Sequence, residues 1–104
     1  MVKIALFCSA GMSTSMLVKK MRIAAEKKGI EAHIEAYPES SLSEKVEEGI
    51  DVALLGPQVR FKLNSAKAVC DPKGVAIEVI DSRLYGMMDG DKVLDNALKL
   101  IEKK

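Results

Sequence analysis

The sequence predicts an α/β domain: an open, four-stranded parallel sheet with helices on both faces. Short apolar runs alternate along the chain with segments whose apolar residues recur at helical spacing. Because crossovers between parallel strands are right-handed, such an alternation folds into a parallel sheet that is wound in both directions. The chain has 104 residues, enough for one hydrophobic core and too few for an independent second lobe. We therefore treat residues 1–104 as a single domain.

The four apolar runs are the expected strands. They are Val2 to Phe7, Ala32 to Ala36, Asp51 to Leu55 and Val75 to Ile80. The first, third and fourth are nearly continuous in apolar residues, as is typical of strands that are covered on both faces. The second alternates apolar with polar residues, which favours an edge position. The most economical doubly wound order for these strands is 2-1-3-4.

The first helix is expected between the first two strands, beginning near Ser13 or Thr14. Its apolar residues form one stripe at helical spacing, made of Leu17, Met21, Ala24 and Ala25. Gly29 follows at the position where a glycine commonly ends a helix. Met16 is expected to fill the core together with Met21.

Three further helices are expected. A short one covers residues 43–48. Pro57 is typical of a first helical turn and predicts a helix that runs to about Val69. The last helix begins after Gly90. Its apolar stripe consists of Val93, Ala97, Leu98 and Ile101.

Composition excludes several classes of function. Sixteen basic residues are balanced by fifteen acidic ones, and a net charge of +1 argues against a large basic surface for nucleic acid. The two cysteines form no disulfide framework and no Cys/His cluster has zinc spacing, so we expect neither a metal nor a cofactor. No segment resembles a signal peptide or approaches the roughly twenty apolar residues that span a bilayer. A monomeric, cytoplasmic protein without membrane insertion is expected.

The segment between the first strand and the first helix carries the chemistry. Apart from one methionine, its residues are small, and they are Cys8, Ser9, Ala10, Gly11, Met12, Ser13, Thr14 and Ser15. Such a loop exposes backbone N–H groups, and the positive end of the next helix dipole favours an anion beside them. These donors would also stabilise a thiolate at Cys8. Nucleophile and anion site then coincide at the topological switch point of the sheet, as covalent phosphoryl transfer requires.

The residue pattern alone leaves other interpretations of the Cys8 segment open. Cys8 could simply end a buried strand while the hydroxyl residues cap a helix. Nucleotide binding has no support, because neither G-x-x-x-x-G-K-[ST] nor G-x-G-x-x-G follows a strand. The low-molecular-weight phosphatases and arsenate reductases also have a cysteine after the first strand. Their loop is C-x5-R, whereas the sixth residue after Cys8 is Thr14, which lacks the bidentate guanidinium.

Four separated segments then resemble one known family in order and spacing. They are Cys8 to Ser15, Glu35 to Glu39, Leu54 to Gln58, and Val79 to Ser82 with Leu84 to Gly86. The family is that of the enzyme IIB components of the bacterial phosphoenolpyruvate-dependent sugar phosphotransferase system (PTS), in the lactose/cellobiose/diacetylchitobiose class. The resemblance extends over residues 1–104 as one IIB domain with a phosphatase-like P-loop after the first strand.

The resemblance implies a phosphoryl carrier. Cys8 would accept a phosphoryl group from a phosphohistidine of the IIA protein and pass it to a β-linked disaccharide, of the cellobiose or diacetylchitobiose type. The membrane protein IIC would hold that sugar, so the carrier would work transiently at the inner face of the membrane. Residues 9–15 would hold the phosphate. A phosphatase-like enzyme and a non-catalytic regulatory IIB-like module stay open as alternatives.

Three residues after the third and fourth strands are candidates for lining the same site: Gln58, Asp81 and Tyr85. Because Asp81 would repel a phosphorylated thiolate, a turn or a hydrogen bond to the backbone is its expected role. His33 lies within the expected edge strand and is interpreted as a solvated or partly buried imidazole. Cys70 is expected at the opposite end of the sheet from Cys8, in a packing role.

Overall fold

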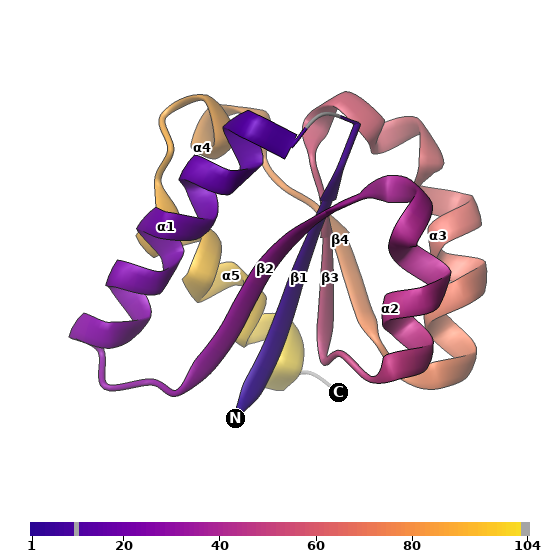
Figure 1. The fold of residues 1–104 in the computed structure, drawn as a ribbon, viewed down its shortest axis with the longest axis horizontal. Helices are drawn as coiled ribbons and strands as arrows, with labels where there is room; N and C mark the ends of the chain where they lie inside the picture. The colour runs from indigo at the N-terminus through magenta and orange to yellow at the C-terminus, as the bar shows by residue number, and fades with distance from the viewer. Residues whose placement is uncertain (10, 103–104) are drawn as a thin grey trace.

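The computed structural model describes residues 1–9 and 11–102, without the side chains of residues 11–13. Nine regular elements follow one another in this part of the chain (Figure 1). They are β1 (Val2–Cys8), α1 (Gly11–Lys27), β2 (Ala32–Pro38), α2 (Leu42–Glu48), β3 (Val52–Leu55), α3 (Leu63–Cys70), β4 (Ala76–Val79), α4 (Ser82–Gly86) and α5 (Gly90–Glu102). Short 3₁₀ turns precede α2 (η1, Glu39–Ser41), precede α3 (η2, Pro57–Lys62) and follow α3 (η3, Asp71–Lys73).

The sheet has the predicted topology. Its order is β2-β1-β3-β4, and all three pairings are parallel. Helices α1, α4 and α5 lie on one side of the sheet, and α2 and α3 lie on the other (Figure 1). The chain therefore winds in one direction from β1 to β2 and in the other from β1 to β3. The carboxyl end of β1 lies at this switch point.

The core consists of two clusters that the sheet separates. Side chains of β1 alternate between them: Ile4 and Leu6 face α1 and α5, while Ala5 and Phe7 face α2 and α3. All four are at most 1% exposed. Because successive strand residues point to opposite faces, a central strand must be apolar at every position. This explains why β1 is apolar at every position from Ile4 to Cys8.

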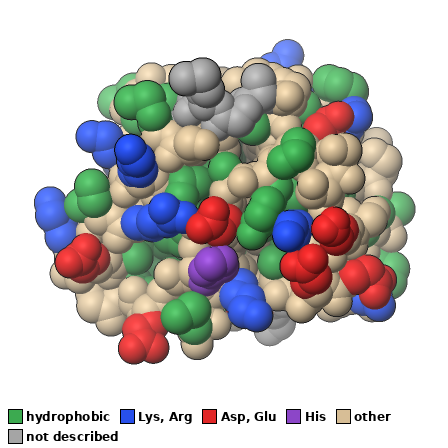
Figure 2. Space-filling model, viewed as in Figure 1, with side chains coloured by type: hydrophobic (Ala, Val, Ile, Leu, Met, Phe, Trp, Pro, Cys, Tyr) green, Lys and Arg blue, Asp and Glu red, His purple; other side chains and the backbone are tan. Residues whose placement is uncertain are grey.

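The two outer strands are partly exposed. The edge position predicted for β2 is confirmed, and Arg22 from α1 donates from Nη2 to the carbonyl oxygen of Ile34 (2.6 Å) and to Oε1 of Glu35 (2.5 Å). Figure 2 shows acidic and basic side chains around the single histidine on this edge. Charges on an edge strand disfavour pairing with another chain. At the other edge, β4 is only half-buried and Glu78 is exposed, unlike the strand covered on both faces that the sequence predicted.

Helix boundaries differ from the prediction in two places. Helix α1 begins at Gly11, two or three residues before the expected start near Ser13 or Thr14. The helix predicted from Pro57 to about Val69 is divided into η2 and α3. Within η2, Val59 has non-helical φ/ψ of −117° and 23°, and its amide donates to the carbonyl of Gly56 (3.0 Å). Its buried side chain packs into the cluster beside α2 and α3, so core packing and the tight turn after Gly56 interrupt the regular helix.

The stripe predicted for α1 is buried, whereas one other residue predicted for the core is not. Met21 is fully buried as expected, but Met16 is 58% exposed. Its position precedes the stripe that begins at Leu17 and therefore points about 100° away from it around the helix. The prediction of Met16 as a core residue was wrong for this reason. The five-residue α4 was not predicted, because it is too short to show helical periodicity.

Candidate functional site

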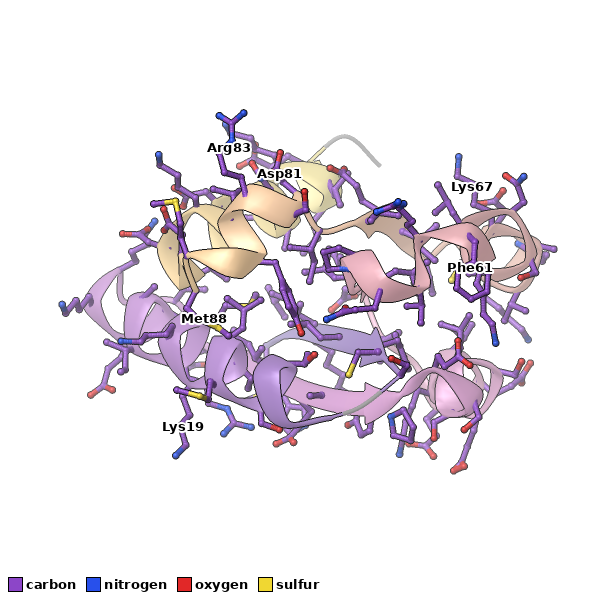
Figure 3. The ribbon with its side chains drawn as sticks, turned by 90° about the horizontal axis from the view of Figure 1, so that it is seen from above. Lys19, Phe61, Lys67, Asp81, Arg83 and Met88 are labelled. Carbon is purple, nitrogen blue, oxygen red and sulfur yellow. The ribbon has the colours of Figure 1, made fainter. Side chains whose placement is uncertain are left out.

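Cys8 is the last residue of β1, at the carboxyl end of the sheet. It is in register with Pro38 of β2, and Phe7 before it is in register with Leu55 of β3. The carbonyl of Phe7 accepts a hydrogen bond from the amide of Gly56 (2.8 Å), which ties the ends of β1 and β3 together beside Cys8. Cys8 is 1% exposed. Figure 3 looks down on this end of the molecule.

The residues that follow Cys8 belong partly to the first turns of α1. The helix begins at Gly11, three residues after Cys8, so the positive end of its dipole lies close to the thiol in the chain. Ser9 and Ser15 are exposed, and Thr14 is fully buried. Of the other residues predicted to hold phosphate, Ala10 lies outside the described residues, and so do the side chains of Gly11, Met12 and Ser13.

Tyr85 connects two of the predicted site residues. Its Oη lies 3.1 Å from Oγ1 of Thr14, and it accepts a hydrogen bond from Nε2 of Gln58 (3.2 Å). Tyr85 belongs to α4 after β4, Thr14 to α1 after β1, and Gln58 to η2 after β3. The segments that leave three strands of the sheet thus meet at one phenolic oxygen. Sequence reasoning named these residues one by one, and their mutual contact is a finding of the structure.

Gly56 is a residue of this site that the amino-acid sequence did not single out. A Cβ at this position would lie 2.7 Å from Oε1 of Gln58 and 3.3 Å from Cβ of Cys8. Its φ of −61° is available to any residue, so the backbone conformation does not require glycine here. An added side chain would displace the end of the Gln58 side chain and crowd Cβ of Cys8. A Gly-Pro pair at a strand end gives no sequence signal for such a close approach.

Asp81 has the backbone role that its charge predicted. Its Oδ1 accepts hydrogen bonds from the amides of Arg83 (2.8 Å) and Leu84 (3.2 Å), so Asp81 is the N-cap of α4. Figure 3 shows Asp81 and Arg83 together at the start of this helix. The described contacts of Asp81 do not join it to the Thr14, Tyr85 and Gln58 cluster.

His33 and Cys70 lie away from this site, as predicted. His33 is exposed within the edge strand β2. Cys70 is fully buried, and its carbonyl accepts from the amide of Val75, just before β4 begins. It therefore lies at the opposite end of the sheet from Cys8. Burial raises the pKa of the Cys70 thiol, and the negative charge of Asp71 adds to this effect, so the thiol stays neutral in its packing role.

Over residues 1–9 and 11–102, no helix is both long enough and apolar enough to cross a bilayer.

Comparison with known proteins identifies the family. The sequence profile of the family described as "PTS system, Lactose/Cellobiose specific IIB subunit" matches residues 3–96. The chain belongs to this family. It is therefore a IIB component, and IIB components are phosphotransferase components of sugar transport. The family indicated by the four sequence segments is thus confirmed.

Several characterised relatives match this IIB component over nearly its whole length. The oligo-beta-mannoside-specific EIIB component of Bacillus subtilis (strain 168) is 42% identical over 101 residues, which cover 97% of each chain. The galactose-specific EIIB component of Lactococcus lactis subsp. cremoris (strain MG1363) is 42% identical over 102 residues and 94% of each chain. The cellobiose-specific EIIB component of Lactococcus lactis subsp. lactis (strain IL1403) has the same identity and coverage.

Solved structures agree with the fold. The solution structure of the cellobiose-specific phosphotransferase IIB component from Borrelia burgdorferi has a TM-score of 0.81 and 46% sequence identity, over 99% of this chain and 94% of that one. The lactose-specific IIB component domain from Streptococcus pneumoniae has a TM-score of 0.82 at 17% identity, over 94% of this chain and 95% of that one. At that identity the second likeness concerns the fold alone.

Proposed function

We propose that this IIB component is a phosphoryl carrier, transiently phosphorylated on Cys8. The thiolate attacks the phosphorus of a phosphohistidine on IIA, so that an S–P bond forms as the N–P bond breaks. A sugar hydroxyl then attacks the same phosphorus, forms an O–P bond, releases its proton and regenerates the thiolate. The observation that carries this proposal is the position of Cys8, at the carboxyl end of a central strand and three residues before the N-terminus of α1.

The phosphate would be held mainly by backbone N–H groups of residues 9–15. Donors already aimed at the phosphoryl oxygens stabilise the charge without a metal or a cofactor. Thr14 would contribute through its backbone, and Tyr85 holds its side chain in place. Gln58 and Tyr85 would line the same site, whereas Asp81 would support it indirectly as the cap of α4.

Access to Cys8 requires local rearrangement. With 1% of the residue exposed, an incoming phosphohistidine reaches the sulfur only when neighbouring groups move aside. Docking of IIA would bring about this movement, and docking on IIC would repeat it for the acceptor. Burial in the unbound carrier would also keep water from the S–P bond between the two transfers.

The acceptor would be a β-linked disaccharide bound by IIC at the inner face of the membrane. The names of the relatives support this class of sugar, since they specify cellobiose and oligo-beta-mannoside, as well as galactose. Uptake of each sugar by cells that lack only this chain tests the choice. Loss of cellobiose or diacetylchitobiose uptake is the expected result, and undiminished uptake of all β-disaccharides would contradict it.

Phosphorylation by purified phospho-IIA, followed by intact-mass measurement, tests the carrier itself. Wild type and Cys70→Ala are expected to gain one phosphoryl group, and Cys8→Ser to gain none. The proposal fails if wild type gains none or if Cys8→Ser gains the same group. Steady turnover of an aryl phosphate without IIA would instead favour a phosphatase, although position 14 holds a buried threonine and no arginine.

A further inference from the structure

Gln58 fixes the direction of one of the two hydrogen bonds at Tyr85 and leaves the phenolic proton free for the other. The amide nitrogen of Gln58 can only donate, so Oη of Tyr85 accepts from it. A phenol has one proton, and this proton is then available to Oγ1 of Thr14, 3.1 Å away. Thr14 in turn keeps its own proton to donate. Hydrogen-bond donation then passes from Gln58 in η2 to Tyr85 in α4 and on to Thr14 in α1.

With the amide nitrogen at Tyr85, the amide oxygen of Gln58 is directed toward Gly56. It lies 2.7 Å from the place where a Cβ of residue 56 would be. If the carboxamide were reversed, its oxygen would accept the phenolic proton, and Tyr85 would then accept from Thr14. The donors would point away from α1. Donation by Gln58 thus favours the arrangement in which the phenolic proton is directed at Thr14.

We propose that Gln58 is a positioning residue for the Cys8 site. By donating to Tyr85 it directs the hydroxyl protons toward the start of α1, where the phosphoryl group and the thiolate would need hydrogen-bond donors. The same bonds join the segments after β1, β3 and β4 into one unit. This inference rests on the proposed phosphoryl-carrier function, but it concerns a residue that acts through Tyr85 and does not touch the reacting atoms.

Two substitutions at position 58 separate the direction of the bonds from their mere presence. Gln58→Met keeps a side chain of similar length but removes its hydrogen bonds. Gln58→Glu accepts the phenolic proton of Tyr85 and so reverses the direction of the hydrogen bonds. We expect Gln58→Met to slow transfer from phospho-IIA about tenfold, the size of one hydrogen bond to a charged site, and Gln58→Glu to slow it further. Asn64→Asp, an exposed position of α3, adds the same charge as a control and should leave the rate unchanged.

A double-mutant cycle shows whether Gln58 acts through Tyr85. If it does, Gln58→Met slows transfer in wild type but has little further effect in Tyr85→Phe. Equal slowing in both backgrounds, or no slowing in either, overturns the proposal. The wild-type protein serves as the reference in this assay. If it is not phosphorylated, the carrier function fails, and this outcome differs from a failure of the Gln58 proposal.

A second readout does not depend on IIA or on phosphoryl transfer. In a Cys70→Ala background only one thiol remains, and its alkylation rate by iodoacetamide is measured against pH. The pH at which the alkylation rate is half its maximum is expected to rise in Gln58→Met and to rise more in Gln58→Glu, because fewer donors then stabilise the thiolate. A lower thermal midpoint with an unmoved alkylation midpoint would mean that Gln58 is only structural, and would overturn the proposal.

Discussion

At the scale of single residues, Gly90 is needed for the space that it leaves. It allows α5 to approach α1. A Cβ at position 90 would lie 2.5 Å from the carbonyl carbon of Lys20 and 2.6 Å from the amide nitrogen of Met21. Both of these are backbone atoms, which cannot turn aside as a side chain can. The approach of the two helices therefore depends on this residue.

The substitution Gly90→Ala should destabilise the protein by about 3 kcal/mol, because α1 and α5 must separate to make room. Gly86→Ala is the matched control, since no atom lies within 4 Å of its added Cβ, and a change within about 0.5 kcal/mol is expected. Urea unfolding at equilibrium measures both. A similar free energy of unfolding for the two variants would contradict the close approach at Gly90.

At the scale of elements, the shortest helix supports the site. Helix α4 has five residues, too few to be stable by itself, yet it carries Tyr85. Asp81 satisfies two of its free amides, and Leu84 and Tyr85 pack against the cluster beside α1 and α5. The position of the Tyr85 hydroxyl thus depends on a capping residue four positions earlier in the chain.

Removal of this cap with Asp81→Ala should cost about 1 kcal/mol of stability. It should also increase amide hydrogen exchange in α4 more than in α3, and slow phosphorylation of Cys8. Asp81→Asn keeps a side-chain oxygen for the same amides and should retain most of both properties. If the alanine and asparagine variants exchange at the same rate in α4, the cap does not hold this helix.

At the scale of the whole molecule, the sheet divides the core into two independent halves. Ile34 belongs to the cluster beside α1 and α5, and Val59 belongs to the cluster beside α2 and α3. Each is at most 2% exposed. Because the strands lie between them, the cavity left by one substitution does not relax into the other.

Ile34→Val and Val59→Ala should therefore have additive effects on stability. About 1 kcal/mol is expected for the first and about 2 kcal/mol for the second, from the methyl groups that each removes. The double variant should lose their sum to within about 0.5 kcal/mol in urea unfolding. A larger interaction energy would mean that the two clusters are coupled across the sheet.

The same scales show how much of the molecule could be predicted. Apolar runs and helical stripes are local patterns, so the strands, the sheet order and the burial of Leu17, Met21, Ala24 and Ala25 followed from them. Where packing or a tight turn prevails over periodicity, the prediction was wrong, as at Met16 and at the break within η2. Helix α4 lacked the length that a periodic signal needs.

We could predict from the amino-acid sequence the order of the sheet, the place of Cys8 at its switch point and the family to which the chain belongs. These depend on local patterns and on motifs that are contiguous in the chain. Folding, and no local pattern, brings Thr14 and Gln58 to Tyr85 across separations of 71 and 27 residues, and places Gly56 beside Cys8. Hydrogen bonds between residues so far apart produce no periodic pattern in the amino-acid sequence, because only folding brings the ends of separate strands to one edge of the sheet.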